Sequence, residues 1–288
     1  MLRTNGLTKR FGGLTAVDDV DFELDDELCS LIGPNGAGKT TFFDLLTGVL
    51  DPSEGTIERR VDGDWTDITD ASPDETARMG VSRSYQITNV FPSLTVLENV
   101  RVAAQAHGDH AATFWRNAGA YDQYVEQAHE ILDRVGLADR ADDLAATLSH
   151  GAGRQLEVAI ALAGDPDVLL LDEPNAGVSS ESVDDIVSLI EEVASDHAVL
   201  LVEHNMDVVM EVSERIVVLN RGSVIADGDP ETVRESPAVQ EAYLGGYEHG
   251  DIDREGGELD FDPSPDSGSG TGSGSGTDSS AGSEEGVS

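Results

Sequence analysis

The chain has 288 residues, of which 39% are apolar, and this is enough for one large or two modest hydrophobic cores. Its formal net charge of -40 would repel nucleic acid and anionic lipid at ordinary salt, so we expect no nucleic-acid partner. The single cysteine, Cys29, excludes an internal disulfide bond and lies in an apolar run, where we expect a buried side chain.

Residues 1–24 alternate apolar and polar side chains in the manner of β-strands, and Phe11-Gly12-Gly13 interrupts them as a turn. The ring of Phe11 is either a core residue or an exposed surface on which a purine base stacks. The residues alone leave both interpretations open.

The next stretch has the pattern of a phosphate-binding loop. The apolar run Leu28–Ile32 predicts a buried strand, Gly33–Thr41 fits G-x-x-x-x-G-K-[ST], and a helix is predicted over 41–48. Glycines let successive backbone N–H groups point inward at a helix N-terminus, which favours anions. Lys39 is placed to reach the β- and γ-phosphates, and the Thr40 hydroxyl to join a Mg²⁺ shell. We therefore expect the chain to bind a nucleoside triphosphate.

Several short elements are predicted between this helix and the next strand. They are a turn, a short edge strand, a polar loop and a helix start with a capping box, at residues 51–55, 56–61, 62–71 and 72–75. The strand Val81–Tyr85 then ends in Gln86, whose amide lies either on the surface or toward the nucleotide site.

Residues 96–148 show helical periodicity throughout, and Gly136 is placed to end the second helix. Another helix is predicted over 154–163. Ser149, with Gly151 and Gly153 nearby, indicates a second anion-binding helix start, which is a weak signal on its own. Because these helices separate two stretches of α/β pattern, we expect a helical subdomain near residues 88–165.

A continuous apolar run, Val168–Leu171, leads directly into Asp172 and Glu173. Such a run predicts a buried parallel strand that delivers two carboxylates to its C-terminal end, where open α/β sheets bind ligands. Asp172 suits a Mg²⁺ shell, and Glu173 suits a base that orients water. The apolar strand 198–202 precedes His204, which is placed to donate a hydrogen bond to a terminal phosphate.

The remaining elements are a helix over 182–194, a hairpin over 215–226 and short helices up to residue 244. The other histidines lack a comparable placement at a strand end. We expect all six on the surface: His107, His110, His129, His150, His197 and His249.

Residues 249–288 are rich in Gly, Ser, Asp and Glu, and we expect a disordered acidic tail. Ten acidic residues and one arginine give this tail a charge of -9, so the rest of the chain carries -31. We interpret this composition as adaptation to concentrated salt, where charges are screened over about 3 Å at 1 M.

No apolar run approaches the ~20 residues that span a bilayer, and no signal-like segment follows Met1. We therefore expect a soluble, intracellular protein that meets any membrane through a partner.

With these motifs in this order, the chain from about residue 3 to 246 resembles the ATP-binding subunits of ABC transporters. The matching positions are the phosphate loop Gly33–Thr41, the Q-loop Gln86, the signature Leu148–Ala152, the Walker B strand Val168–Glu173 and the switch histidine His204. The resemblance implies an α/β P-loop NTPase fold with a mainly parallel sheet, an antiparallel β edge subdomain and a helical subdomain. It also implies an ATP-binding domain over 1–248.

The resemblance assigns site residues as well, with ATP and Mg²⁺ as cofactors. It implies catalytic roles for Glu173, His204 and Gln86, and a Mg²⁺ site at Thr40, Gln86 and Asp172. It makes Phe11 the adenine-stacking aromatic. The implied nucleotide-binding set is Phe11, Val17, Gly33, Pro34, Asn35, Gly36, Ala37, Gly38, Lys39, Thr40, Thr41, Ser149 and Gly151.

By the same resemblance, two such subunits enclose two ATP molecules, and each site takes Ser149 and Gly151 from the second subunit. Hydrolysis then drives transmembrane permease subunits, and an extracellular solute-binding protein belongs to the same system. The ATPase subunit would lie in the cytoplasm, on the inner face of the cell membrane.

Some segments are similar to the branched-chain amino-acid import ATPases: 11–17, 94–100, 175–178, 202–206 and 242–245. ATPases of urea or amide uptake and of lipopolysaccharide export share much of this pattern. Two positions depart from the family and bear on turnover: Ala152 stands where the signature usually ends in Gln, and Ser179 where Asp or Asn is frequent.

A soluble ABC-type ATPase of DNA repair or translation is the alternative from another class. Such proteins usually have a long coiled coil or two nucleotide domains in one chain, and neither is evident here. A plain P-loop kinase would lack the counterparts of Ser149, Gly151 and His204.

Overall fold

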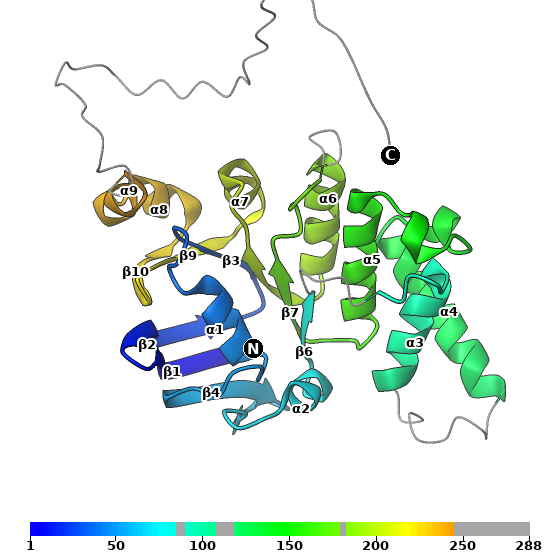
Figure 1. Cartoon of the computed structure of the whole chain (residues 1–288), viewed down its shortest axis with the longest axis horizontal. Coiled ribbons are helices and arrows are strands. Elements are labelled where there is room, and N and C mark those ends of the chain that lie inside the picture. Colours follow the sequence, from blue (N-terminus) through cyan, green and yellow to red (C-terminus); the bar gives the residue numbers. More distant parts are fainter. Residues whose placement is uncertain (85–89, 108–117, 179–182, 245–288) are drawn as a thin grey trace, which may run out of the picture. The chain divides into compact units, whose positions relative to one another are not determined.

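The computed structural model describes residues 1–84, 90–107, 118–178 and 183–244 (Figure 1). Their strands form two sheets, one antiparallel and one mainly parallel, as the alternating and continuous apolar runs predict. Gln86, Ser179 and the predicted acidic tail 249–288 lie outside the described residues.

The antiparallel sheet has the strand order β2-β1-β4-β5. Its strands are Leu2–Phe11 (β1), Leu14–Leu24 (β2), Glu54–Val61 (β4) and Asp64–Asp67 (β5). The prediction of an edge strand at 56–61 followed by a loop is wrong, because β4 pairs with both β1 and β5. Asp62 and Gly63 have φ of 52° and 94°, the positive values that a tight two-residue hairpin turn requires.

The second sheet has the order β10-β9-β3-β8-β7-β6. Its strands are Leu28–Ile32 (β3), Val81–Ser84 (β6), Val168–Asp172 (β7), Ala198–Val202 (β8), Arg215–Asn220 (β9) and Ser223–Gly228 (β10). All neighbouring pairs are parallel except β9 and β10, which form the predicted hairpin. The carboxyl ends of β3, β7 and β8 therefore lie along one edge of the sheet.

Each face of this sheet is covered by a different set of elements (Figure 1). Leu169 and Leu171 of β7 pack in a cluster with α5 (His150–Leu162), α6 (Val183–Ala194) and α7 (Met206–Val212). Val168 and Leu170 face the other way and pack with α1 (Lys39–Leu46) and the antiparallel sheet. Cys29 is fully buried on this second face, as predicted.

The predicted helical segment contains two long helices, α3 (Val96–His107) and α4 (Ala118–Arg134). It is not helical throughout: between the end of α4 and residue 148, the chain forms only two single 3₁₀ turns, Ala138–Arg140 and Ala145–Thr147. Gly136 ends α4 as predicted, with φ of 72°. The N–H groups of Gly136 and Leu137 donate to the carbonyls of Asp133 and Leu132, which satisfies two carbonyls at the helix end.

Three further helices complete the described chain: α2 (Pro73–Arg78), α8 (Pro230–Glu235) and α9 (Pro237–Leu244). The predicted capping box forms at α2, where the backbone and hydroxyl of Ser72 donate to Glu75 at 2.9 and 2.7 Å. The prediction that His197 lies on the surface is wrong. It is 7% exposed, and its Nδ1 lies 2.7 Å from the Pro166 carbonyl, because the residue directly precedes β8 in the interior.

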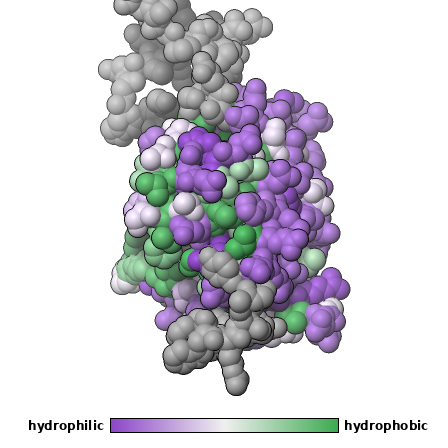
Figure 2. Space-filling model, turned by 90° about the vertical axis from the view of Figure 1, so that its right-hand side faces the viewer, coloured by the Kyte–Doolittle hydropathy of each residue, from purple (hydrophilic) through white to green (hydrophobic). Residues whose placement is uncertain are grey.

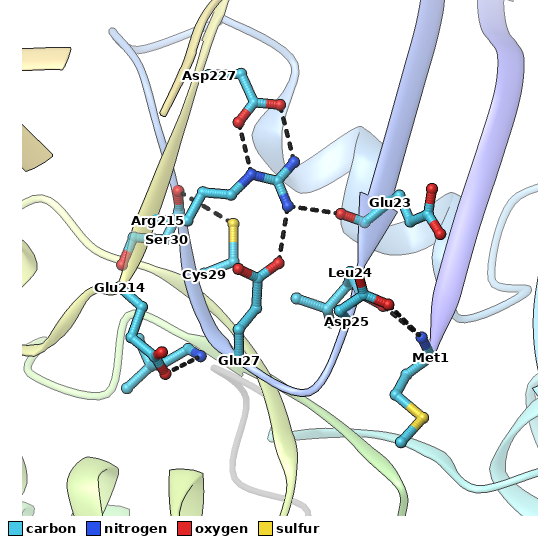
Figure 3. A network of polar contacts seen from close by, with 11 residues as sticks. Met1, Glu23, Leu24, Asp25, Glu27, Cys29, Ser30, Glu214, Arg215 and Asp227 are labelled. Carbon is cyan, nitrogen blue, oxygen red and sulfur yellow. Dashed lines mark hydrogen bonds and ion pairs between the residues drawn. The ribbon is translucent and has the colours of Figure 1, made fainter. Parts of the chain in front are cut away.

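A dense polar network lies at the amino ends of β3 and β9 (Figure 3). The guanidinium of Arg215 donates to both carboxylate oxygens of Asp227, at 2.6 and 2.8 Å. It also donates to Glu27 and to the backbone carbonyl of Glu23, each at 2.8 Å. Since Glu23 belongs to β2, this network connects the two sheets.

On the face seen in Figure 2, hydrophilic residues predominate and hydrophobic ones form patches between them. Within the described ranges, no helix combines the length and the hydropathy that crossing a bilayer requires.

Candidate functional site

Two glycines of the loop between β3 and α1, Gly33 and Gly38, could not be replaced by another residue without a backbone shift. Gly38 has φ of 109°, and a Cβ there would lie 2.3 Å from the carbonyl oxygen of Ala16. A Cβ on Gly33 would lie 2.0 Å from the carbonyl oxygen of Leu219. The helix begins at Lys39, two residues earlier than predicted, so its N-terminal N–H groups belong to the loop itself.

This loop forms one wall of a cavity of about 640 Å³. The cavity brings together most of the predicted nucleotide-binding residues with Glu173 and His204. Its lining is Phe11, Leu14, Thr15, Ala16, Asn35, Gly36, Ala37, Gly38, Lys39, Thr40, Thr41, Glu173, His204 and Arg221.

Phe11 lies at the turn between β1 and β2 and is 47% exposed, so the interpretation as a core residue is wrong. Phe11 lines the cavity, and the Nζ of Lys9 lies 5.3 Å from its ring centroid. Val17 does not line this cavity. It is fully buried between the antiparallel sheet and α1, and its neighbour Ala16 lies at the cavity wall instead.

The amine of Lys39 lies inside the curl of the loop. The residue is only 7% exposed, and its Nζ donates to the carbonyls of Gly33 and Pro34 at 2.6 and 3.3 Å. Burial lowers the pKa of Lys39, whereas the nearby carboxylates of Glu173 and Asp172 raise it. The loop thus presents a partly desolvated cation whose hydrogen bonds, among the described residues, go to neutral carbonyls.

Glu173 and His204 come from the ends of adjacent strands and meet at the cavity. Glu173 directly follows β7, and its backbone N–H donates to the carbonyl of Val202 in β8 at 2.8 Å. His204 Nε2 lies 2.9 Å from Glu173 Oε1. A carboxylate and an imidazole in contact beside a phosphate loop can orient a water molecule and hydrogen-bond a phosphate.

Asp172, also predicted at this edge, is not in the cavity lining but is paired with a residue that the sequence analysis missed. Arg83 of β6 donates to Asp172 at 2.5 Å and to Asp44 of α1 at 2.6 Å. Its guanidinium carbon lies 5.4 Å from the ring centroid of Phe43. Arg83 and Asp172 are 7% and 5% exposed at their side chains, so this bridge is internal.

Glu203 is a second residue that the sequence analysis missed. It is 4% exposed, and its carboxylate accepts from the backbone N–H groups of Asn175 at 2.8 Å and His204 at 3.1 Å. The N–H of Asn205 lies 3.5 Å from Oε2, the oxygen that accepts from His204. Burial raises the pKa of Glu203, and the backbone donors oppose this shift. Its position directly before His204 was the available signal.

Ser149 and Gly151 lie at the start of α5, which begins at His150, four residues before the predicted start. Ser149 is the N-cap, and its hydroxyl accepts from the N–H of Ala152 at 3.3 Å. Neither residue lines the cavity formed by the phosphate loop. Gln86 lies outside the described residues.

Comparison with known families gives two matches along the chain. Residues 17–176 match the family described as ABC transporter, and residues 223–249 match the branched-chain amino acid ATP-binding cassette transporter family. Two similar proteins are high-affinity branched-chain amino acid transport ATP-binding proteins. BraF of Pseudomonas aeruginosa is 40% identical over 253 residues, and LivG of Salmonella typhimurium is 40% identical over 258 residues. Each match covers 85% of this chain and 98% of the relative.

Solved structures of ABC transporter cassettes are similar to this chain. The ADP conformation of MJ1267, an ATP-binding cassette of an ABC transporter, has a TM-score of 0.75 at 30% identity, covering 85% of this chain and 98% of that one. The dimeric structure of MJ0796, a bacterial ABC transporter cassette, has a TM-score of 0.66 at 26% identity, covering 80% and 99%. The chain therefore belongs to the ABC transporter family of ATP-binding subunits, which couple ATP hydrolysis to transport.

Proposed function

We propose that this chain is the ATP-hydrolysing subunit of an importer for branched-chain amino acids or similar small polar solutes. The proposed ATPase activity rests on one observation: the phosphate loop and the Glu173–His204 pair line the same cavity. The solute class rests on the 40% identity to BraF and LivG and on the match over residues 223–249. We infer an ATP-binding domain over 1–248, a helical subdomain near 88–165 and an acidic tail over 249–288.

In this proposal the cavity holds ATP with its base near the β1–β2 turn and its phosphates in the loop. Phe11 offers an exposed ring for stacking on adenine. The N–H groups at the start of α1 and the amine of Lys39 neutralise phosphate charge. Phosphate oxygens would replace the carbonyl acceptors of Lys39, which restores charge pairing to a desolvated cation.

The side chains near the phosphate loop fit a Mg²⁺ ion bound together with ATP. Mg²⁺ prefers oxygen ligands and usually takes one or two protein groups, with phosphates and water completing its shell. Thr40 offers a hydroxyl at the cavity wall, and Asp172 offers a carboxylate of which Oδ2 is held by Arg83. Mg²⁺ would neutralise charge that develops on the phosphates during transfer.

Glu173 then acts as the base that orients the attacking water, and His204 holds the base and approaches the terminal phosphate. The two roles of the site separate in variants. Lys39→Ala should abolish ATP binding, whereas Glu173→Gln should keep binding and lose hydrolysis. Binding of a fluorescent ATP analogue and release of phosphate measure the two properties. Equal turnover of the wild type and Glu173→Gln would refute the role of Glu173.

The positions of Ser149 and Gly151 away from the cavity support a site completed by a second subunit. They present a hydroxyl and a helix N-terminus, which suit a γ-phosphate. The similarity to the dimeric cassette MJ0796 supports the same arrangement. In the Glu173→Gln background, ATP should convert monomer to dimer, and Ser149→Arg should block dimerisation without changing ATP affinity. Light scattering that detects only monomer at every ATP and subunit concentration, with a related subunit present, would contradict this.

A groove of about 210 Å³ supports docking of a permease helix, which would hold the subunit at the inner face of the membrane. Val90, Ala103 and Ile160 are among its lining residues, and the nearby Phe91 is 54% exposed. In the assembled transporter, Phe91→Asp should abolish transport and leave basal ATPase activity intact. Simultaneous loss of both would indicate that this segment only supports the fold.

We also propose that the charge of -40 is an adaptation to concentrated salt. Because the Debye length lengthens from about 3 Å at 1 M to about 10 Å at 0.1 M, acid–acid repulsion should grow as salt is removed. The melting temperature should therefore fall steadily on dilution from molar to 0.1 M potassium chloride. An unchanged melting temperature over this range would contradict the proposal.

A further inference from the structure

The loops that follow β7 and β8 are joined by side chains at two separate points. The first is the contact between Glu173 and His204, at 2.9 Å. The second is formed by Glu203, which accepts from the N–H of Asn175 with one oxygen and from the N–H of His204 with the other. The Glu203 carboxylate therefore bridges the backbone beyond Glu173 and the backbone of His204 itself.

The loop after β7 has an unfavourable conformation that other residues must stabilise. Glu173 has φ of 48°, in the left-handed region that costs a non-glycine residue on the order of 1–3 kcal/mol. The amide nitrogen and oxygen of the Asn175 side chain are both buried, and neither has a hydrogen-bond partner among the described residues. Such a conformation persists only where neighbouring groups fix it. The N–H of Asn175 donates to the Glu203 carboxylate and the N–H of Glu173 donates to the Val202 carbonyl, and these two hydrogen bonds supply this constraint.

We propose that Glu203 is a positioning residue for ATP hydrolysis. Its carboxylate holds the Glu173–Asn175 segment against the His204 backbone, so that the Glu173 carboxylate stays aligned with the imidazole. This inference rests on the proposed function of Glu173 as the base. Glu203 itself does not line the cavity of the phosphate loop, so it acts through these two residues.

The geometry favours a carboxylate over an amide at this position. The N–H groups of Asn175 and His204 converge on the two oxygens, and the N–H of Asn205 approaches one of them. A glutamine would supply one acceptor and would turn its NH₂ group toward a backbone donor. Glu203→Gln should therefore keep half of the bridge, and Glu203→Ala should remove it and leave the donors unpaired.

Glu214 provides a matched control. Its carboxylate also accepts from a backbone N–H, that of Leu28 at 3.1 Å, but at the opposite end of the sheet. With Mg-ATP at high salt, Glu203→Gln should lower kcat about 10-fold and Glu203→Ala about 100-fold, the scale expected for a misplaced catalytic group. ATP affinity should stay within about twofold, because Lys39 and the phosphate loop are untouched. Glu214→Gln should match the wild type in both properties.

An independent readout is the nitrogen NMR spectrum of the His204 side chain in nucleotide-free protein. Loss of the bridge should shift the His204 resonances in both Glu203 variants and not in Glu214→Gln. Wild-type turnover and unshifted resonances in Glu203→Gln would overturn the inference, as would parallel losses of kcat and ATP affinity. If Glu203→Ala does not fold, Glu203→Gln decides alone. Wild-type ATP hydrolysis in Glu173→Gln would instead refute the role of Glu173 as the base. Loss of hydrolysis in Glu173→Gln with wild-type hydrolysis in both Glu203 variants would refute only the role of Glu203.

Discussion

Both ends of the six-stranded sheet carry charged side chains, but the hydrogen-bond partners of these side chains differ between the two ends. At the amino end, the guanidinium of Arg215 has charged or carbonyl acceptors on three sides, at 2.6 to 2.8 Å (Figure 3). At the carboxyl end, among the described residues, the amine of Lys39 donates to two backbone carbonyls and the buried Asn175 amide has no partner. Glu173 has positive φ.

This difference indicates that one end of the sheet mainly stabilises the fold and the other end binds ligand. The arginine network stabilises the position of β2 against β3, β9 and β10, and the charge of Arg215 is already balanced by the carboxylates of Asp227 and Glu27. Incompletely satisfied and strained groups raise the free energy of the unbound protein, and a charged ligand can relieve that cost. The carboxyl end is therefore the end where ligand chemistry is expected.

The largest effect on stability is expected from the buried ion pair between Arg83 and Asp172 near the carboxyl end. Arg83→Gln would leave the buried Asp172 carboxylate without its cation, and removing one partner of a buried pair costs about 3–5 kcal/mol. Urea unfolding at constant high salt measures this loss. Asp44→Asn is the control: Asp44 is 25% exposed, and the amide keeps an acceptor for Arg83, so about 1 kcal/mol is expected. Similar losses in both variants would contradict the central place of the Arg83–Asp172 pair.

Gly38→Ala should have a smaller effect on stability and a clear effect on ATP binding. Its Cβ would force the loop away from the carbonyl of Ala16, so we expect a loss of about 1–3 kcal/mol and at least about 10-fold weaker ATP binding. Gly63 is the control, since it has φ of 94° but no neighbour within 4 Å of a Cβ. Gly63→Ala should cost only the backbone strain, and unchanged ATP affinity in Gly38→Ala would rule out the tight loop geometry.

Cys29 tests the packing at the amino end. Burial raises the pKa of its thiol to about 12, from an ordinary value of 9.0. The native thiol should therefore stay protonated and unreactive toward an aromatic disulfide at pH 8, and urea should accelerate labelling. Because the unfolded thiol ionises first, stability should fall as pH rises from 9 toward 12. Labelling of native protein at the rate of a free thiol would contradict this packing.

The smallest effect is expected from truncation at Gly250. The removed residues lack the composition of a packed core, so turnover and melting temperature should both stay unchanged at high salt. A lower melting temperature, or a lower turnover rate, would reveal contacts between this segment and the rest of the chain.

Much of this architecture could be predicted from local patterns. The continuous apolar runs before Gly33 and Asp172 predict buried parallel strands, and a strand, a glycine loop and a helix in series predict the phosphate loop. Each signal is a continuous stretch of the sequence, and the longest of them runs from Leu28 to Gly48. The Asp62-Gly63 turn was an equally local signal, and it was missed because the strand after it has only four residues.

The missed site residues depend on distant pairings instead. Arg83 meets Asp172 because β6 and β7 pair in one particular register, in which Arg83 lies opposite Leu170. Glu203 bonds to Asn175 across two loops, 28 positions apart in the sequence. The partner of a buried side chain on another strand leaves no periodic pattern in the neighbouring sequence. These two roles can therefore be recognised only when the pairing of the strands is known.

The most direct test of the separation between the two ends measures turnover and the free energy of unfolding on two variants at the same high salt. Glu173→Gln should lose hydrolysis and unfold within about 0.5 kcal/mol of the wild type, since it breaks no buried ion pair. Arg215→Ala should lose about 2–4 kcal/mol, below the full cost of a buried pair because its side chain is 23% exposed, and should keep its turnover while folded. Loss of stability in Glu173→Gln together with loss of turnover in folded Arg215→Ala would contradict the account.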